Sequence, residues 1–329
     1  MELDDLDNLA LPWPDEGKPS DGLPMARVGL RMAFYFDSGY TRELRAALIS
    51  IVDEYLAASG GQMRAYQRSG DSRRKSATPA KPVDLGVLRQ RVEDFRTSWS
   101  LEMSSESDIS VASLWSLETV ASEDGYLLVH FPVSAFRGAA PHSFRNTFQR
   151  WCGALRVTHA YAGLGLALPV GGTVMSAAIK RCGPYATRFV GLDLDYPQTV
   201  AFRCHGGIRT VNWLTAIDKT RLEKVGEAAR VTRARAPDIQ AMDYDGGTIF
   251  VAGQAPQIGD ASTGQFPEAY AILGRLVAPL RSDIPDAWFK APDGYEAPAG
   301  FTSKAGNRDA EPEQLPALHY TKTWMARFG

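Results

Sequence analysis

Two pairs of aspartates, each separated by one residue, are the side chains in this sequence best suited to chemistry. Asp193 and Asp195 stand in the run GLDLDYP, and Asp243 and Asp245 stand in MDYDGG. On a strand, both members of a pair would point to one side, and the two pairs together could bind a hard cation through oxygen. A metal-dependent hydrolase is therefore one interpretation. The same runs are also typical of a tight hairpin turn and a loop, in which carboxylates are usually solvated.

Other catalytic signals are weak. The sequence has no GxSxG, HExxH, GxxxxGK[ST] or strand-following GxGxxG motif, so the patterns that carry a known mechanism are missing. Its five histidines lie far apart, and the adjacent pair Cys204-His205 would point to opposite faces of a strand. Gly163 and Gly165 favour close packing of strands over nucleotide binding. We therefore expect no enzyme activity, no cofactor and no metal ion.

Composition and charge exclude further classes. Lys and Arg total 36 against 38 for Asp and Glu, so the formal net charge of −2 gives no overall positive field for direct nucleic-acid binding. The longest uncharged run, 160–179, is interrupted by glycine and proline, which argues against a membrane span. The amino terminus has no basic start followed by an apolar stretch. With three widely spaced cysteines that we expect to be reduced and buried, these features indicate a cytoplasmic protein.

The hydrophobic pattern indicates one ordered domain after an acidic arm. Residues 1–25 are rich in acids and proline, and we expect an extended arm there; the single domain would span 26–329. The run 28–36 predicts a strand covered on both faces, and apolar residues at three- and four-residue steps over 44–56 predict a helix. The basic, serine-rich stretch 68–82 predicts a flexible solvated loop inside the domain.

Helices and strands alternate irregularly in the rest of the chain. Further helices are predicted over 85–99, 144–155, 173–181 and from 267 onward, and strands over 98–103, 111–118, 126–133, 161–168 and 208–217. The three strands over 98–103, 111–118 and 126–133 are typical of an antiparallel meander, and no strict βαβ order appears. We therefore predict an α+β fold with a mostly antiparallel mixed sheet and packed helices.

Seven blocks of the sequence give it a family resemblance. VNWLTAIDKTRLEKVG, GGTIFVAGQAPQIGD and PEAYAILGRLVAPLR occur in this order, and VGLRMAFYF, AYAGLGLALP, FVGLDLDYP and YTKTWMARFG agree as well. Together they resemble the type VI secretion immunity proteins that are encoded beside nuclease toxins of the restriction-endonuclease-like (VRR-Nuc) kind. The resemblance covers 27–328, without the acidic arm or the basic loop.

The resemblance implies a cytoplasmic antidote without catalysis. Its partner would be a cognate effector toxin, in this family usually a nuclease, whose active site or substrate groove it would occlude. A non-inhibitory effector adaptor or chaperone is the remaining alternative beside the metal-dependent hydrolase. Because a nuclease groove is positively charged, its inhibitor gains on-rate by presenting acids there. The predicted contact residues are two acidic pairs and the tyrosines next to them: Asp193, Asp195, Tyr196, Asp243, Tyr244 and Asp245.

Overall fold

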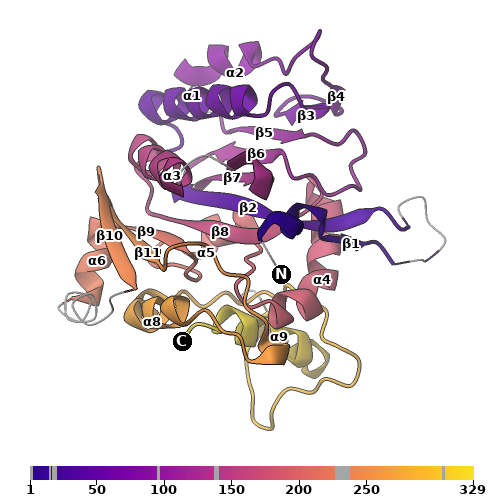
Figure 1. Ribbon diagram of the computed structural model, residues 1–329, viewed down its shortest axis with the longest axis vertical. Helices are drawn as coiled ribbons and strands as arrows, with labels where there is room; N and C mark the ends of the chain where they lie inside the picture. Colours follow the sequence, from indigo (N-terminus) through magenta and orange to yellow (C-terminus); the bar gives the residue numbers. More distant parts are fainter. Residues whose placement is uncertain are drawn as a thin grey trace.

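A large sheet organises the protein (Figure 1). The computed structural model describes residues 3–14, 16, 21–94, 97–136, 141–226, 238–305 and 308–329. In this part of the chain the sheet has eleven strands in the order β10-β11-β9-β8-β2-β7-β6-β5-β3-β4, with β1 beside β2. All pairings between its named strands are antiparallel. The predicted α+β fold with a mostly antiparallel sheet is confirmed.

The strands vary from two to thirteen residues. Their bounds are β1 Ala10–Pro12, β2 Pro24–Phe36, β3 Ala65–Arg68, β4 Lys75–Ser76, β5 Trp99–Ser104, β6 Ser116–Ala121, β7 Gly125–Phe131, β8 His159–Ala167, β9 Leu214–Asp218, β10 Ile239–Tyr244, β11 Gly247–Ala252, and in a separate two-stranded sheet β12 Lys304–Ala305 and β13 Arg308–Asp309.

Helices precede, interrupt and follow the strands. The α-helices are α1 Arg42–Ala58, α2 Gly86–Gln90, α3 Pro141–Leu155, α4 Gly172–Arg188, α5 Pro197–Arg203, α6 Lys219–Val225, α8 Glu268–Leu276 and α9 Leu315–Met325. Short 3₁₀ segments are η1 Leu3–Asn8, η2 Arg91–Glu93, η3 Val133–Phe136, η4 Ala261–Thr263, η5 Ala278–Leu280 and η6 Pro312–Gln314. In Figure 1, α1 and α2 lie near β3 and β5, whereas α8 and α9 lie at the opposite end of the molecule.

One face of the sheet is covered by α1 and α3. Tyr55 of α1 packs edge-on against Phe131 of β7, with ring centroids 5.3 Å apart. Phe34 of β2 contacts the rings of Phe148 and Trp151 on α3. Because side chains alternate along a strand, these contacts identify the inner face of β2 and β7. Large aromatic side chains on this face exclude water and supply much of the hydrophobic stabilisation.

The second face is covered over only part of its width. Over β2 and β7 it packs against α4 and α5, and most of the strand residues there are buried. Over β3, β5 and β6 several residues that point to this side are only half-buried, whereas Ser104 and Ser116 are buried. The half-buried residues are Gln67, Ser100, Glu102, Glu118 and Val120. The sheet therefore has one open half, opposite α1.

The amino-terminal segment differs from the predicted extended arm. Leu6 in η1 is 1% exposed, and Trp13 donates its indole N–H to the Ser110 carbonyl at 2.7 Å. Strand β1 adds to β2 in antiparallel register. Apolar residues among the acids thus let 3–14 pack onto the domain, because burial of a few large side chains offsets the entropy of ordering the chain.

Three other elements differ from their sequence-based predictions. The stretch 68–82 contains β4, and the buried Arg68 donates to Asp71 and Asp84, so it is not a wholly solvated loop. The helix predicted over 85–99 is shortened to α2 and η2, because the sequence from Trp99 onward pairs as β5. Helix α4 continues through Pro184 to Arg188, beyond its predicted end.

Candidate functional site

Asp193 and Asp195 lie in the core, where they are 0% and 3% exposed. The backbone of Asp193 pairs beside β8, accepting from Leu166 N–H at 2.8 Å and donating to the Leu164 carbonyl at 3.0 Å. This short parallel pairing holds the following residues against the second face of β2 and β8. The expected exposed acidic patch therefore does not include these two residues.

Buried arginines from distant segments neutralise both carboxylates. Arg209 donates from Nη2 to Asp193 at 2.7 and 2.8 Å, and its Nε lies 3.1 Å from Asp195 Oδ1. Arg31 of β2 lies 3.1 Å from Asp193 and 2.7 Å from Asp195. Tyr35 Oη donates to Asp195 at 2.6 Å. We call these five residues the ion cluster; it ties the centre of the sheet to the segments that cover it.

The aspartates and arginines of the ion cluster strongly favour their charged forms over their neutral forms, although they are buried. Burial raises the pKa of Asp193, but the guanidinium groups of Arg209 and Arg31 outweigh it and hold the pKa at about 2. The same carboxylates raise the pKa of Arg209 against the opposing effect of burial. Such paired buried charges cost much to break, because removal of one partner leaves an uncompensated charge. The ion cluster is therefore a structural element.

Gly163 and Gly165 allow this close packing. A Cβ on Gly165 would lie 2.2 Å from Arg31 Cδ, and one on Gly163 would lie 2.2 Å from Asn212 Oδ1. The prediction that these glycines serve strand packing is confirmed.

The second aspartate pair stands at a hairpin. Tyr244 ends β10 opposite Gly247 of β11, and Asp245 and Gly246 form the two-residue turn. Asp243 and Asp245 are exposed, whereas Tyr244 is 8% exposed and donates its hydroxyl to the Val157 carbonyl at 3.1 Å. The hairpin interpretation of this run is thus confirmed.

The two aspartate pairs do not meet. In the described ranges, no group of three or more histidine, cysteine, aspartate and glutamate side chains could hold a metal ion. The metal-dependent hydrolase required such a group. Tyr196, the last of the six predicted contact residues, is half-buried, with its ring 5.8 Å from that of Trp288. Of the six, only Asp243 and Asp245 are exposed, and their contact with a partner stays a prediction.

The open half of the sheet forms the floor of a groove. Register places Glu102 of β5 opposite Glu118 of β6, and Glu118 opposite Leu128 of β7. Their neighbours in the next row are Val120 and Tyr126. These side chains point away from α1, because the intervening Leu117 and Leu127 are fully buried on its side.

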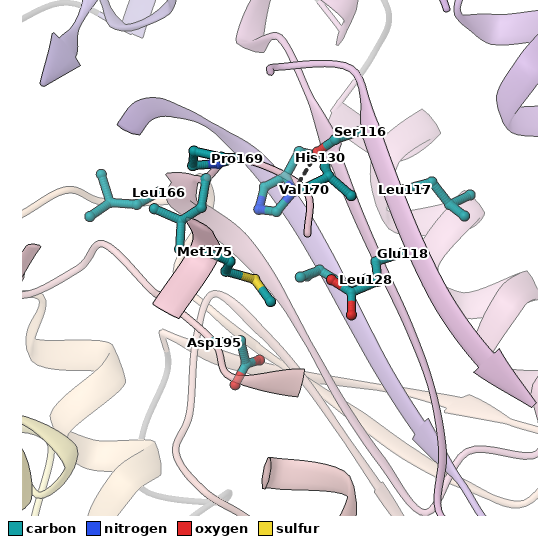
Figure 2. A pocket seen from close by; sticks show the side chains of 11 residues that line it. Ser116, Leu117, Glu118, Leu128, His130, Leu166, Pro169, Val170, Met175 and Asp195 are labelled. Atoms are coloured by element: carbon teal, nitrogen blue, oxygen red, sulfur yellow. Dashed lines mark hydrogen bonds between the residues drawn. The ribbon is translucent and has the colours of Figure 1, made fainter. Parts of the chain in front are cut away.

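Three hollows follow one another along this floor. One of about 370 Å³ lies between β3, β5 and the start of α4, and one of about 470 Å³ lies between the ends of β6 and β7 and helix α5. A narrow hollow of about 20 Å³, the size of a water site, lies between them. In Figure 2, Glu118 and Leu128 stand on one side of it, and Met175 and Asp195 stand on the other.

The three hollows adjoin one another, because neighbouring residues line them on both sides. On the floor, Glu102 borders the first hollow and the opposite Glu118 borders the second. On the other wall, Val174 and Met175 are consecutive, as are Asp195 and Tyr196. We call this feature the sheet groove; it is lined by residues of the three hollows.

Large apolar side chains stand at both ends of the sheet groove. Phe202 of α5 is 58% exposed and lines the larger end hollow, and Ile109 is 44% exposed and lines the other. Exposed large apolar residues grouped around a groove are typical of protein contact sites.

The groove floor holds carboxylates in a poorly solvated place. Burial raises the pKa of Glu118 to about 7; a hydrogen bond from the Tyr126 hydroxyl opposes this rise, and the charge of Glu102 adds to it. Burial also raises the pKa of Glu102. His130, deeper in the same hollow, shares a 3.1 Å hydrogen bond with Ser116 Oγ, and burial lowers the pKa of its imidazole to about 3. It is therefore neutral, and the acids dominate the local charge.

Sequence reasoning did not find the sheet groove. The run SLETVA around Glu118 shows the alternation of a half-buried strand, which indicated only that one face of β6 is polar. Nothing in it shows that the facing residues belong to α4 and α5, because that depends on tertiary packing.

A family model and a solved structure that match this chain both describe proteins of type VI secretion systems. The model of a family described as "TsiV: Type VI immunity for VRR-NUC" matches residues 47–302. No curated protein matches the chain. Among solved structures, the chain is similar to the Pseudomonas aeruginosa T6SS protein PA0821, with a TM-score of 0.71 and 18% identity over 93% of this chain and 85% of that one. At this identity the structural likeness shows a shared fold.

The helices give no sign of a membrane span. Among the helices that the described residues form, none is both long and apolar enough to cross a bilayer.

Proposed function

The chain belongs to the TsiV family of type VI immunity proteins for VRR-Nuc effectors, and from this premise we propose that it binds a cognate VRR-Nuc effector and blocks its nuclease activity. The blocked feature would be the active site or the groove that holds the substrate. The family match over 47–302 is the observation that carries this proposal. In this proposal, neutralisation requires binding alone, with no catalysis by the chain and no contact between the chain and nucleic acid.

The structure supports binding by a preformed surface. The ion cluster and the aromatic core fix the sheet, so a partner would meet a largely rigid surface and binding would cost little ordering entropy. The charge of −2 and the exposed carboxylates suit a partner with a positive DNA-binding surface. Because such an effector acts on nucleic acid inside the cell, we place the encounter in the cytoplasm.

Growth protection tests this function and its location together. A VRR-Nuc effector from the same bacterium would be produced in the bacterial cytoplasm, with the chain either retained there or directed to the periplasm. We expect survival only with the cytoplasmic chain, and a stable complex of the two proteins on size exclusion. A complex without protection would indicate an adaptor or chaperone instead. Without a complex, the proposed function would be rejected.

A further inference from the structure

Strand β10 ends the large sheet on one side, and no further strand of the described residues lies along its outer edge (Figure 1). Its six residues pair with β11 in continuous register, and none of them is proline or lysine. Other strands with a free edge are shorter: β4 has two residues, one of them Lys75, and β1 ends at Pro12 after a shift of register. Lysine, proline, short length and irregular register are features that prevent another strand from adding to a sheet. Strand β10 has none of these features.

Hydrogen bonds to β11 show which residues of β10 turn their backbone groups outward. Asp238, which directly precedes β10, accepts at its carbonyl from the Gly253 N–H at 2.8 Å and therefore faces β11. Along an antiparallel strand, alternate residues bond to the neighbour on one side and to the neighbour on the other side. The register of β10 and β11 continues this alternation without a bulge. The residues whose N–H and C=O groups point to the outer edge are Ile239, Ala241 and Asp243.

Most of these outward backbone groups have no protein partner. The Asp243 carbonyl accepts from Gln149 Nε2 of α3 at 2.5 Å, which agrees with its outward direction. Ile239 and Ala241 each keep one N–H and one C=O that bond to no other described residue. These two donors and two acceptors lie at the spacing of a strand, so an extended segment can add to the sheet through them.

The charges around this edge indicate what kind of segment fits. Asp238, Asp243 and Asp245 are exposed, and within the described ranges none of them has an ion pair. If two copies of the chain paired along β10, both sets of carboxylates would meet and repel each other. A segment with lysine or arginine would be attracted instead. The carboxylates therefore favour a basic partner over a second copy of this chain.

We infer that the outer edge of β10 accepts an extended, basic segment of the VRR-Nuc effector as an added strand of the sheet. This inference rests on the proposed function. A nuclease carries lysine and arginine where it holds DNA phosphates, so it has basic segments that suit this edge. Backbone hydrogen bonds with Ile239 and Ala241 hold the segment, and the aspartates select it by charge.

Ala241→Pro tests the added strand. Proline removes the outward N–H and places its ring where the added strand would lie, but it removes no bond to β11. The matched control is Ser76→Pro on the other edge strand, β4. Ser76 also faces outward, because the next residue, Ala77, donates its N–H to the Arg64 carbonyl on the inner side. Calorimetry would measure the affinity of each variant for the effector, and urea unfolding would compare their folding with that of the wild type.

We expect Ala241→Pro to bind the effector at least tenfold more weakly and to unfold like the wild type, whereas Ser76→Pro binds like the wild type. Equal affinity of Ala241→Pro and the wild type would overturn the inference and leave the proposed function intact. A dimer of the chain alone that Ala241→Pro dissociates would also overturn it, because a second copy would then occupy the edge. If the wild type does not bind the effector, the proposed function itself has failed.

Hydrogen exchange tests the same edge without any substitution. In the free protein, the amides of Ile239 and Ala241 should exchange fast, whereas those of Gln240 and Met242, which bond to β11, should exchange slowly. We expect saturating effector to slow the two outward amides at least tenfold. Unchanged exchange of these amides in the complex would overturn the inference, even where Ala241→Pro fails to fold.

The charge of the bound segment has its own test. Asp238→Asn/Asp243→Asn removes two carboxylates beside the edge and leaves the backbone groups in place. Its control, Glu43→Gln/Asp53→Asn, removes two charges from α1, which packs over β7. In stopped flow at several salt concentrations, we expect the first variant to associate more slowly and with less dependence on salt, and the control to associate like the wild type. Equal or faster association of the first variant would overturn the inference, because the segment would then not be basic.

Discussion

Glu118→Gln should stabilise the free protein at alkaline pH. In the unfolded chain the Glu118 carboxyl has a pKa of 4.5, and burial in the folded protein raises this pKa to about 7. Below pH 4.5 the group is protonated in both states and contributes nothing. Between these two values the folded state binds the proton more tightly, so stability falls as the pH rises. Well above pH 7 the ionised Glu118 carboxylate lowers the free energy of unfolding by at most about 3 kcal/mol.

Glutamine avoids this cost because it has the same shape and no charge. Its side-chain oxygen can still accept the hydrogen bond from the Tyr126 hydroxyl. Urea unfolding of the wild type and of Glu118→Gln would be compared at pH 8 and pH 4.5. We expect the variant to be more stable by about 1–3 kcal/mol at pH 8 and equal at pH 4.5. A variant that is equal or less stable at pH 8 would refute the account of a desolvated, repelled carboxylate.

Three further changes test other parts of the structure. Asp195→Ala leaves two buried arginines to share the single carboxylate of Asp193 and should cost about 3–5 kcal/mol in urea unfolding; a cost below about 1 kcal/mol would contradict the ion cluster. Gly165→Ala should lower stability by about 1–3 kcal/mol in thermal unfolding, because its Cβ would meet Arg31, whereas the unobstructed Gly172→Ala should not. Asp245→Lys tests the predicted contact of the β10–β11 hairpin: more than tenfold weaker effector binding would support it, and unchanged affinity would exclude it.

A carboxylate that destabilises the free protein is informative about function. Stability and activity often conflict where a binding site must be kept ready for a partner. Glu118 and Glu102 lie opposite each other on a polar strand face, and a neutral pair there would fold with less strain.

Local patterns in the sequence were sufficient to predict the elements with a clear period. The apolar stripe from Leu44 to Leu56 became α1, and the continuous apolar run before Phe36 became the buried part of β2. Asp245-Gly246 forms the two-residue hairpin turn that an Asp-Gly pair favours. In each case neighbouring residues alone determine the structure.

Contacts between distant segments explain the failures. Asp193 and Asp195 were predicted to be on the surface because their charges suggest solvation. Partners from other segments, Arg31 and Arg209 above all, make their burial favourable. Leu6 and Trp13 anchor a segment whose average composition is acidic. The sheet groove depends on which half of the sheet α4 and α5 leave open, and no local pattern reports this.

A plasmid-cleavage titration tests the central claim most directly. The VRR-Nuc protein would be held at a fixed concentration, well above the dissociation constant, while the chain is added from zero to two equivalents. We predict that cleavage falls linearly and ends near one equivalent. A complex that forms at one equivalent and still cuts the plasmid would contradict inhibition by occlusion.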